Sequence, residues 1–303
     1  MTDAATHLGP DAAAEAAASA DLGSLGAEIA WTSSEAAIAV RDAFPAGYGR
    51  LGELAEWLAA TRDGAVRPLG RVRLLLAGDA TPQVAEMAHR SGLGVRQLAP
   101  EPGADVLGAI RLGVAVADDE VDSGAELLVV ACPAAPPDAP VAARAAAAAL
   151  AGALSGAEPV ALLPRGRDAL DTRDWIARAE YLRDSRRRLM AARGRPDALL
   201  GDIGDHALAM LAGLVLRATA RRTPLVLDGA AALAAALLCR DIQPRAVRWW
   251  RAADTSPDPV HRRCCDELGL TPVLGLGTSA GHGLGGVLCL PLLHAAAELS
   301  GRR

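Results

Sequence analysis

A glycine-rich segment near the end of the chain, residues 281–286 with the sequence Gly-His-Gly-Leu-Gly-Gly, contains the residue types best suited to chemistry. Glycine tolerates positive φ angles and lets a ligand approach the backbone closely. An apolar run typical of a helix follows, and free amides at a helix N-terminus can bind an anion. His282, in the middle, could act as a base or donate a hydrogen bond to a bound ring or phosphate. A histidine satisfied within a turn is the alternative.

Polar side chains also follow three apolar runs elsewhere in the sequence. Asp79 and Asp228 come directly after such runs, where each could bind a ribose or a cation, or cap the next helix. Arg165 and Arg167 flank Gly166 after a third run. Two guanidinium groups beside a glycine could clamp a phosphate, although a solvated loop is equally compatible with this pattern.

The composition excludes several classes of site. The chain contains no lysine and no asparagine, so it lacks the lysine of a Walker-type phosphate loop and that of a pyridoxal-phosphate Schiff base. Its five cysteines are odd in number and none forms a Cys-x-x-Cys pair. This argues against a disulfide framework or a structural zinc site. No cluster of metal ligands is visible, and we expect neither a metal nor a cofactor.

Charge and hydropathy indicate a globular protein that binds a small molecule. The 303 residues carry a net charge of −5, which argues against nucleic acid or an anionic membrane surface as a partner. Hydrophobic residues make up 51% of the chain, enough for a sizeable core. No secretory signal pattern opens the sequence, and no apolar stretch resembles a membrane span. We therefore expect a cytoplasmic protein.

Short apolar runs alternate with helical patterns from residue 72 onward. We expect strands at residues 72–77, 95–98, 126–131, 159–163, 223–227, 247–250 and 272–276. Runs of this kind, each followed by a helix, are typical of parallel strands buried on both faces. The expected fold is α/β, with a doubly wound, mostly parallel Rossmann-like sheet. Ligands of such sheets bind where strands end and helices begin, which draws attention to Asp79, Asp228 and the segments 132–140, 164–167, 254–261 and 281–286.

Several segments, taken together, resemble nicotinate-nucleotide–dimethylbenzimidazole phosphoribosyltransferases of cobalamin biosynthesis. Residues 221–229, Arg-Arg-Thr-Pro-Leu-Val-Leu-Asp-Gly, are similar to a late strand of that family. Further similar segments follow in the family's order: 47–58, 76–79, 119–128, 249–270 and 274–293. The resemblance implies transfer of phosphoribose from nicotinate mononucleotide to 5,6-dimethylbenzimidazole or a related base. It also implies substrate contacts from Asp79, Arg165, Gly166, Asp228, Ser256, His261, Gly281, Gly283 and Gly285.

The chain departs from the family pattern at its active-site motifs. A family glycine-rich loop is replaced by residues 132–140, which contain no glycine, and the "RGTG" motif survives only as residues 165–168, Arg-Gly-Arg-Asp. His282 stands where the family has the glutamate that the resemblance implies is the general base. A neutral imidazole could accept the proton, because its pKa lies nearer neutrality, but it lacks the charge that stabilises an oxocarbenium-like C1′.

The same resemblance implies a domain plan and three functional alternatives. Residues 28–66 would be the N-terminal helices of a small domain, 67–287 the α/β domain, and 288–303 a C-terminal helix that joins the small domain. Composition, rather than the resemblance, indicates a flexible tail over residues 1–27, which are rich in Ala, Gly, Ser and Asp. The chain would form a homodimer, or a heterodimer with a paralogue. It is either a divergent transferase, an impaired partner subunit of an intact paralogue, or a binding module for a base or cobamide precursor.

Overall fold

A five-stranded parallel sheet forms the centre of the molecule. The computed structural model describes residues 21–43, 48–64, 68–100, 104–165, 171–278 and 280–299. The strands are β1 (Arg71–Ala77), β2 (Gly94–Leu98), β3 (Ala125–Ala131), β4 (Leu225–Asp228) and β5 (Trp250–Ala252). Their order is β2-β1-β3-β4-β5, and every neighbouring pair is parallel. This confirms the doubly wound sheet, whose strand order reverses between β1 and β3.

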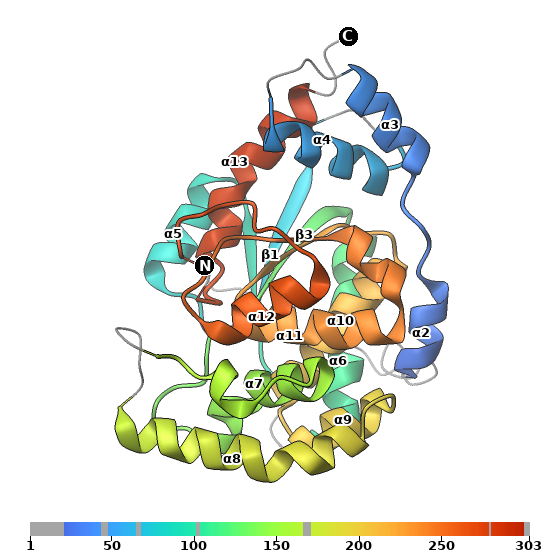
Figure 1. Cartoon of the computed structure of the whole chain (residues 1–303). Helices are drawn as coiled ribbons and strands as arrows, with labels where there is room; N and C mark the ends of the chain where they lie inside the picture. Colours follow the sequence, from blue (N-terminus) through green and yellow to red (C-terminus); the bar gives the residue numbers. More distant parts are fainter. Residues whose placement is uncertain are drawn as a thin grey trace.

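Helices cover both faces of the sheet, because alternate strand residues enter two separate cores (Figure 1). Leu128 and Val130 of β3 belong to the first core, and Leu127 and Val129 to the second. The first core is built with α6 (Val106–Asp122), α7 (Val141–Ser155), α10 (His206–Ala220) and α11 (Ala230–Ile242). The second is built with α4 (Arg50–Thr61), α5 (Pro82–Arg90) and α13 (Leu284–Leu299).

Three expected strands differ from the structure. Residues 159–163 contain a 3₁₀ helix, η1 (Pro159–Leu162), rather than a strand. The strand expected at 247–250 is largely the 3₁₀ helix η3 (Pro244–Trp249), and β5 starts at Trp250. Residues 272–276 form no strand, although Val273 and Leu274 donate backbone hydrogen bonds to Ala252 and Ala253. Proline opens both 3₁₀ helices, where its fixed φ suits a helical first turn.

The expected flexible tail is too long. Residues 1–20 lie outside the described part of the chain, but α2 (Leu22–Glu28) is a capped helix. Its Leu22 and Leu25 are fully buried in the first core, next to α10 and α11. Asp21 caps the helix by accepting hydrogen bonds from the amides of Gly23 and Ser24. The tail boundary at residue 27 is therefore wrong, because burial of two leucines fixes this segment.

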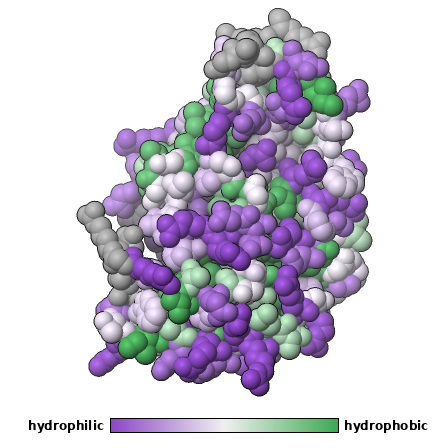
Figure 2. Space-filling view, viewed as in Figure 1, coloured by the Kyte–Doolittle hydropathy of each residue, from purple (hydrophilic) through white to green (hydrophobic). Residues whose placement is uncertain are grey.

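Three of the remaining helices lie at the two ends of the molecule, and the fourth lies near its middle (Figure 1). α3 (Ser34–Ala43) packs on α4, which packs on α13, at the top of Figure 1. α8 (Thr172–Ala191) and α9 (Pro196–Ile203) lie with α7 at the bottom, and α12 (Pro259–Leu268) packs on α11. The division into a large and a small domain stays a prediction. No helix within the described ranges is long and apolar enough to cross a membrane, and hydrophilic side chains cover most of the face in Figure 2.

Helices α6 and α10 cross at unusually close range because each has a glycine at the contact. A Cβ atom at Gly113 of α6 would overlap the carbonyl oxygen of Met210. A Cβ atom at Gly213 of α10 would likewise overlap the carbonyl oxygen of Ile110. The two backbones therefore touch directly, and this contact anchors the layer that supports β3 and β4.

We expect Gly113→Ala to lower the free energy of unfolding by about 2 kcal/mol or more, because the two helices must separate to admit the methyl group. Gly201→Ala on α9 is the matched control, since a Cβ atom there meets nothing within 4 Å. The control should be neutral or stabilising by up to about 1 kcal/mol, from helix propensity. Urea denaturation measures both variants, and equal stability of the two would contradict the close contact.

Candidate active site

The glycine turn lies directly on the carboxyl ends of the central strands. Gly281 and Gly283 have φ angles of 83° and 85°, which favour glycine. A Cβ atom at Gly281 would overlap the carbonyl oxygen of Cys132, just after β3. A Cβ atom at Gly229, just after β4, would lie 2.8 Å from the amide nitrogen of Gly281. Three backbone segments thus meet with no room for side chains.

The next two contacts fix the start of α13 beside the sheet. A Cβ atom at Gly283 would lie 2.8 Å from a methyl carbon of Leu74 on β1. A Cβ atom at Gly285 would lie 3.1 Å from the Cβ atom of Asp254. His282, between the two positive-φ glycines, is half-buried, and its Nδ1 atom is buried without a hydrogen-bond partner among the described residues. Among the described residues, the turn therefore holds an imidazole nitrogen without a partner near the β1/β3 switch point.

Asp228 is fully buried and supports the turn from beneath. Its Oδ2 atom accepts a hydrogen bond of 3.3 Å from the amide of Gly286, in the first turn of α13. The helix that follows Asp228 in sequence, α11, has Gly229 at its N-cap and receives no side-chain cap. Asp228 thus caps α13, a helix distant in sequence. The sequence predicted either a ribose or cation contact or a cap on the next helix, and not this role.

Asp254, the first residue of the 254–261 segment expected at a strand end, is a second buried carboxylate. Its Oδ1 atom accepts hydrogen bonds from the amides of Thr255 and Leu276, both 2.7 Å long. Its Oδ2 atom accepts from the amide and hydroxyl of Thr278, at 2.7 and 2.6 Å. Burial by itself would raise the pKa of Asp254, but these hydrogen bonds outweigh it and lower the pKa. The ionised carboxylate therefore organises the loop that leads into the glycine turn.

Asp79 and Arg165 are exposed to solvent. Asp79 has no hydrogen bond or ion pair with the described residues, because Thr81 caps α5 in its place. Arg165 follows η1 rather than a strand, and its Nη2 atom donates to the carbonyl of Val160 at 3.1 Å. Gly166 lies outside the described residues. A free carboxylate at the end of β1 is suitably placed to contact a ligand at the switch point.

Ser256 and His261 are buried and engaged in packing. The Oγ atom of Ser256 accepts a hydrogen bond of 3.2 Å from the amide of Asp258, just before α12. His261 is 1% exposed, and its Nδ1 atom lies 3.8 Å from the Sγ atom of Cys265. Burial lowers the pKa of His261 to about 4, so the imidazole is neutral at pH 7. Substrate contacts from these two side chains stay a prediction.

Asp205, at the N-cap of α10, is another acid near the sheet edge that the sequence analysis missed. It accepts a hydrogen bond of 2.8 Å from the amide of Leu208. Burial raises its pKa, and its charge acts on the thiol of Cys132 and the phenol of Tyr181. Burial also raises the pKa of Cys132 to about 12, so this thiol stays protonated. An aspartate before a helical run is a signal that capping rules could have found.

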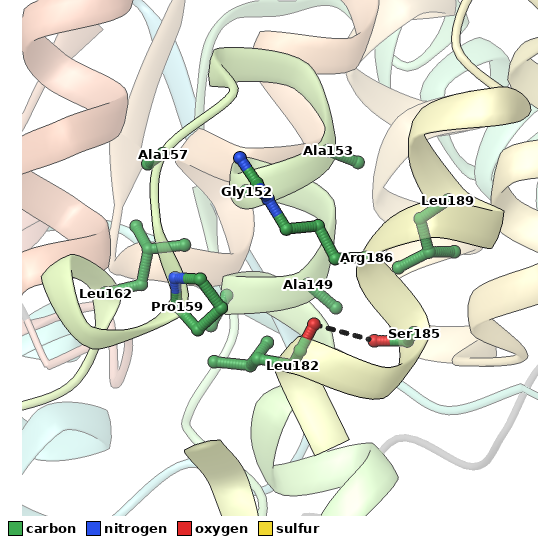
Figure 3. Close-up of a pocket in the computed structure, with 11 residues that line it drawn as sticks. Ala149, Gly152, Ala153, Ala157, Pro159, Leu162, Leu182, Ser185, Arg186 and Leu189 are labelled. Atoms are coloured by element: carbon green, nitrogen blue, oxygen red, sulfur yellow. Dashed lines mark hydrogen bonds between the residues drawn. The ribbon is translucent and has the colours of Figure 1, made fainter. Parts of the chain in front are cut away.

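One small cavity lies away from this edge, between α7 and α8 (Figure 3). Its volume is about 10 Å³, room for one water molecule, so it cannot hold a substrate. Within the described ranges, no three His, Cys, Asp or Glu side chains are grouped as metal ligands.

We expect Asp254→Asn to lower the free energy of unfolding by about 2 kcal/mol or more, because an amide nitrogen cannot accept the hydrogen bonds that one carboxylate oxygen accepts. Asp266→Asn is the control, since Asp266 is exposed on the neighbouring helix α12. Thermal and urea unfolding at pH 7 compare the two. An Asp254 variant as stable as the control would show that the loop does not depend on this carboxylate.

We also expect His261 to make stability pH-dependent. An unfolded histidine titrates near ~6.5, whereas the folded pKa is about 4, so the unfolded chain binds more protons between these values. The contribution of the neutral His261 side chain to the free energy of unfolding is therefore full above pH ~6.5. It is lost as the pH falls toward 4, by up to about 1.4 kcal/mol per pH unit. His261→Gln should remove this slope in urea titrations at pH 5 and 7. His89→Gln, exposed on α5, should keep it, and parallel curves for wild type and His261→Gln would refute the assignment.

Comparison with known proteins places this geometry in a family. A family model described as phosphoribosyltransferase, DBI_PRT, matches residues 102–302. The nicotinate-nucleotide–dimethylbenzimidazole phosphoribosyltransferase of Streptomyces avermitilis is 32% identical over 313 residues, which cover 84% of this chain and 82% of the relative. That of Corynebacterium efficiens is 38% identical over 197 residues, 65% of this chain but about half (52%) of the relative.

A solved structure agrees with these sequence matches. The crystal structure of CobT from Thermus thermophilus superposes with a TM-score of 0.75 at 26% identity, and the match covers 88% of this chain and 95% of that one. The similarity thus extends over most of the sheet and its helices. This chain belongs to the nicotinate-nucleotide–dimethylbenzimidazole phosphoribosyltransferase family.

Proposed function

We propose that this chain transfers phosphoribose from nicotinate mononucleotide to 5,6-dimethylbenzimidazole or a related aromatic base, in the lower-ligand branch of cobalamin biosynthesis. The observation that carries the proposal is the half-buried His282, whose Nδ1 atom lacks a partner among the described residues beside the β1/β3 switch point. Its family relatives carry the same activity in their names. Asp79, exposed at the end of β1, would contact the substrate.

In the proposed reaction His282 is the general base. The imidazole takes the proton from one nitrogen of the base while the other nitrogen attacks C1′ of nicotinate mononucleotide. The C1′–nitrogen bond to nicotinate breaks, nicotinate leaves, and an α-ribotide forms. A base of this kind contributes about 10²- to 10⁴-fold to the rate.

The buried carboxylates would supply the negative charge that a neutral imidazole lacks. Asp228 and Asp254 lie directly beneath the turn that holds His282. Hydrogen bonds keep the pKa of Asp254 low against the effect of burial, so this group is ionised at pH 7. Negative charge preorganised near C1′ would stabilise an oxocarbenium-like transition state. The Gly286 amide at the N-terminus of α13 already donates its hydrogen bond to Asp228, so it is not available to the substrate phosphate. Arginines such as Arg165 would bind that phosphate.

The assembly and location of the protein stay predictions. A homodimer, or a heterodimer with a paralogue, would follow the family plan, and a cytoplasmic location would suit the small-molecule substrates.

The test is an assay in which the protein is incubated with nicotinate mononucleotide and 5,6-dimethylbenzimidazole, and the nicotinate released is measured by chromatography. We expect His282→Ala to lower kcat by about 10²-fold or more, and added imidazole to restore part of the rate. His89→Ala, on the exposed end of α5, should behave as wild type. No turnover by the wild type with this base, adenine or phenols would overturn the proposal. An unchanged rate in His282→Ala would remove His282 as the base.

A further inference from the structure

A second cavity, about 220 Å³ in volume, opens at the β5 edge of the sheet. Its walls come from the first turn of α4, from β5, and from the segment that follows α12. The lining residues are Arg50, Glu53, Leu54, Arg251, Gly269, Leu270, Thr271 and Val273. None of them belongs to the carboxyl-edge site described above, so this cavity is a separate feature.

Arg251 is the unusual member of this lining. Its guanidinium carbon lies 4.8 Å from the centre of the Trp57 ring, and its Nη1 atom donates to the carbonyl of Trp250 at 2.8 Å. Within the described ranges no carboxylate forms an ion pair with it. The Glu53 charge acts on Arg251 without a hydrogen bond, and burial lowers the pKa of Arg251 to about 10. Arg251 is half-buried, and among the described residues the guanidinium edge that does not bond Trp250 has no anionic partner.

The rest of the lining defines the chemistry that would fit. Arg50 donates to the carbonyl of Pro272, which holds a second guanidinium at the rim. Because two arginines face only one acid, Glu53, the lining carries a net positive charge. Leu54 and Leu270 are buried and Val273 is half-buried, so they form an apolar wall beside the charges.

We propose that this cavity binds a small organic monocarboxylate, with its carboxylate on the Arg251 guanidinium and its apolar body against Leu54, Leu270 and Val273. Arginine suits a carboxylate because its planar fork donates two parallel hydrogen bonds. Stacking on Trp57 keeps the fork in one orientation before the ligand arrives. The proposal does not depend on the transferase activity.

The test is isothermal titration calorimetry of the full chain with benzoate. We expect one site with a Kd of about 1 mM, as a few contacts to a small ligand would give. Arg251→Gln should weaken binding about tenfold or more, because a charge-assisted pair is lost. Thr271→Trp should also weaken it by filling the cavity, while the guanidinium stays in place. Arg248→Gln is the matched control, since Arg248 stacks on Trp31 at 5.3 Å and does not line the cavity.

Two further titrations set the specificity. Benzamide, the neutral analogue, and inorganic phosphate should both bind more weakly than benzoate. The proposal is overturned if benzoate gives no saturable binding, if benzamide or phosphate binds as well as benzoate, or if Arg248→Gln weakens binding as much as Arg251→Gln. Should Arg251→Gln fail to fold, Thr271→Trp decides: benzoate affinity equal to that of the wild type would then contradict the site.

Discussion

Direct contact between three backbone segments at the carboxyl edge of the sheet is the constraint on which the rest of the site depends. Gly281 packs on the backbone of Cys132 and Gly229, and Gly283 packs on Leu74. These contacts bring the end of β3, the end of β4 and the start of α13 together without intervening side chains. The imidazole of His282 is held half-buried as a result, since the residues on both sides of it are fixed by packing.

Two buried carboxylates accept hydrogen bonds from backbone amides around the glycine turn. Asp228 accepts from Gly286, and Asp254 accepts from three backbone amides of the preceding loop and from a threonine hydroxyl. Gly286 is buried, and its amide would cost about 1–3 kcal/mol if it were left unpaired. The hydrogen bonds to Asp254 lower its pKa and so place a negative charge under the turn.

Much of this could be predicted from the sequence, and the misses have physical reasons. The runs that became β1 and β3 are continuous apolar strands buried on both faces, so the parallel sheet followed from them. The expected strand at residues 272–276 failed because its backbone hydrogen bonds to Ala252 and Ala253 form without a regular ladder. The 254–261 segment was expected at a strand end, but the hydrogen bonds of Asp254 could not be predicted because two of its partners lie 22 and 24 residues further along the chain. Asp228 capped a helix 58 residues away, which no local rule could indicate.

The central claim is that the glycine turn presents His282 to the aromatic base. Nitrogen-15 NMR of protein labelled at its six histidines tests it most directly, with the His282 signals assigned by substitution. On addition of 5,6-dimethylbenzimidazole, the ring nitrogen signals of His282 should move while those of the exposed His89 stay unchanged. The account would be contradicted if calorimetry shows saturable binding of 5,6-dimethylbenzimidazole while the ring nitrogen signals of His282 do not move.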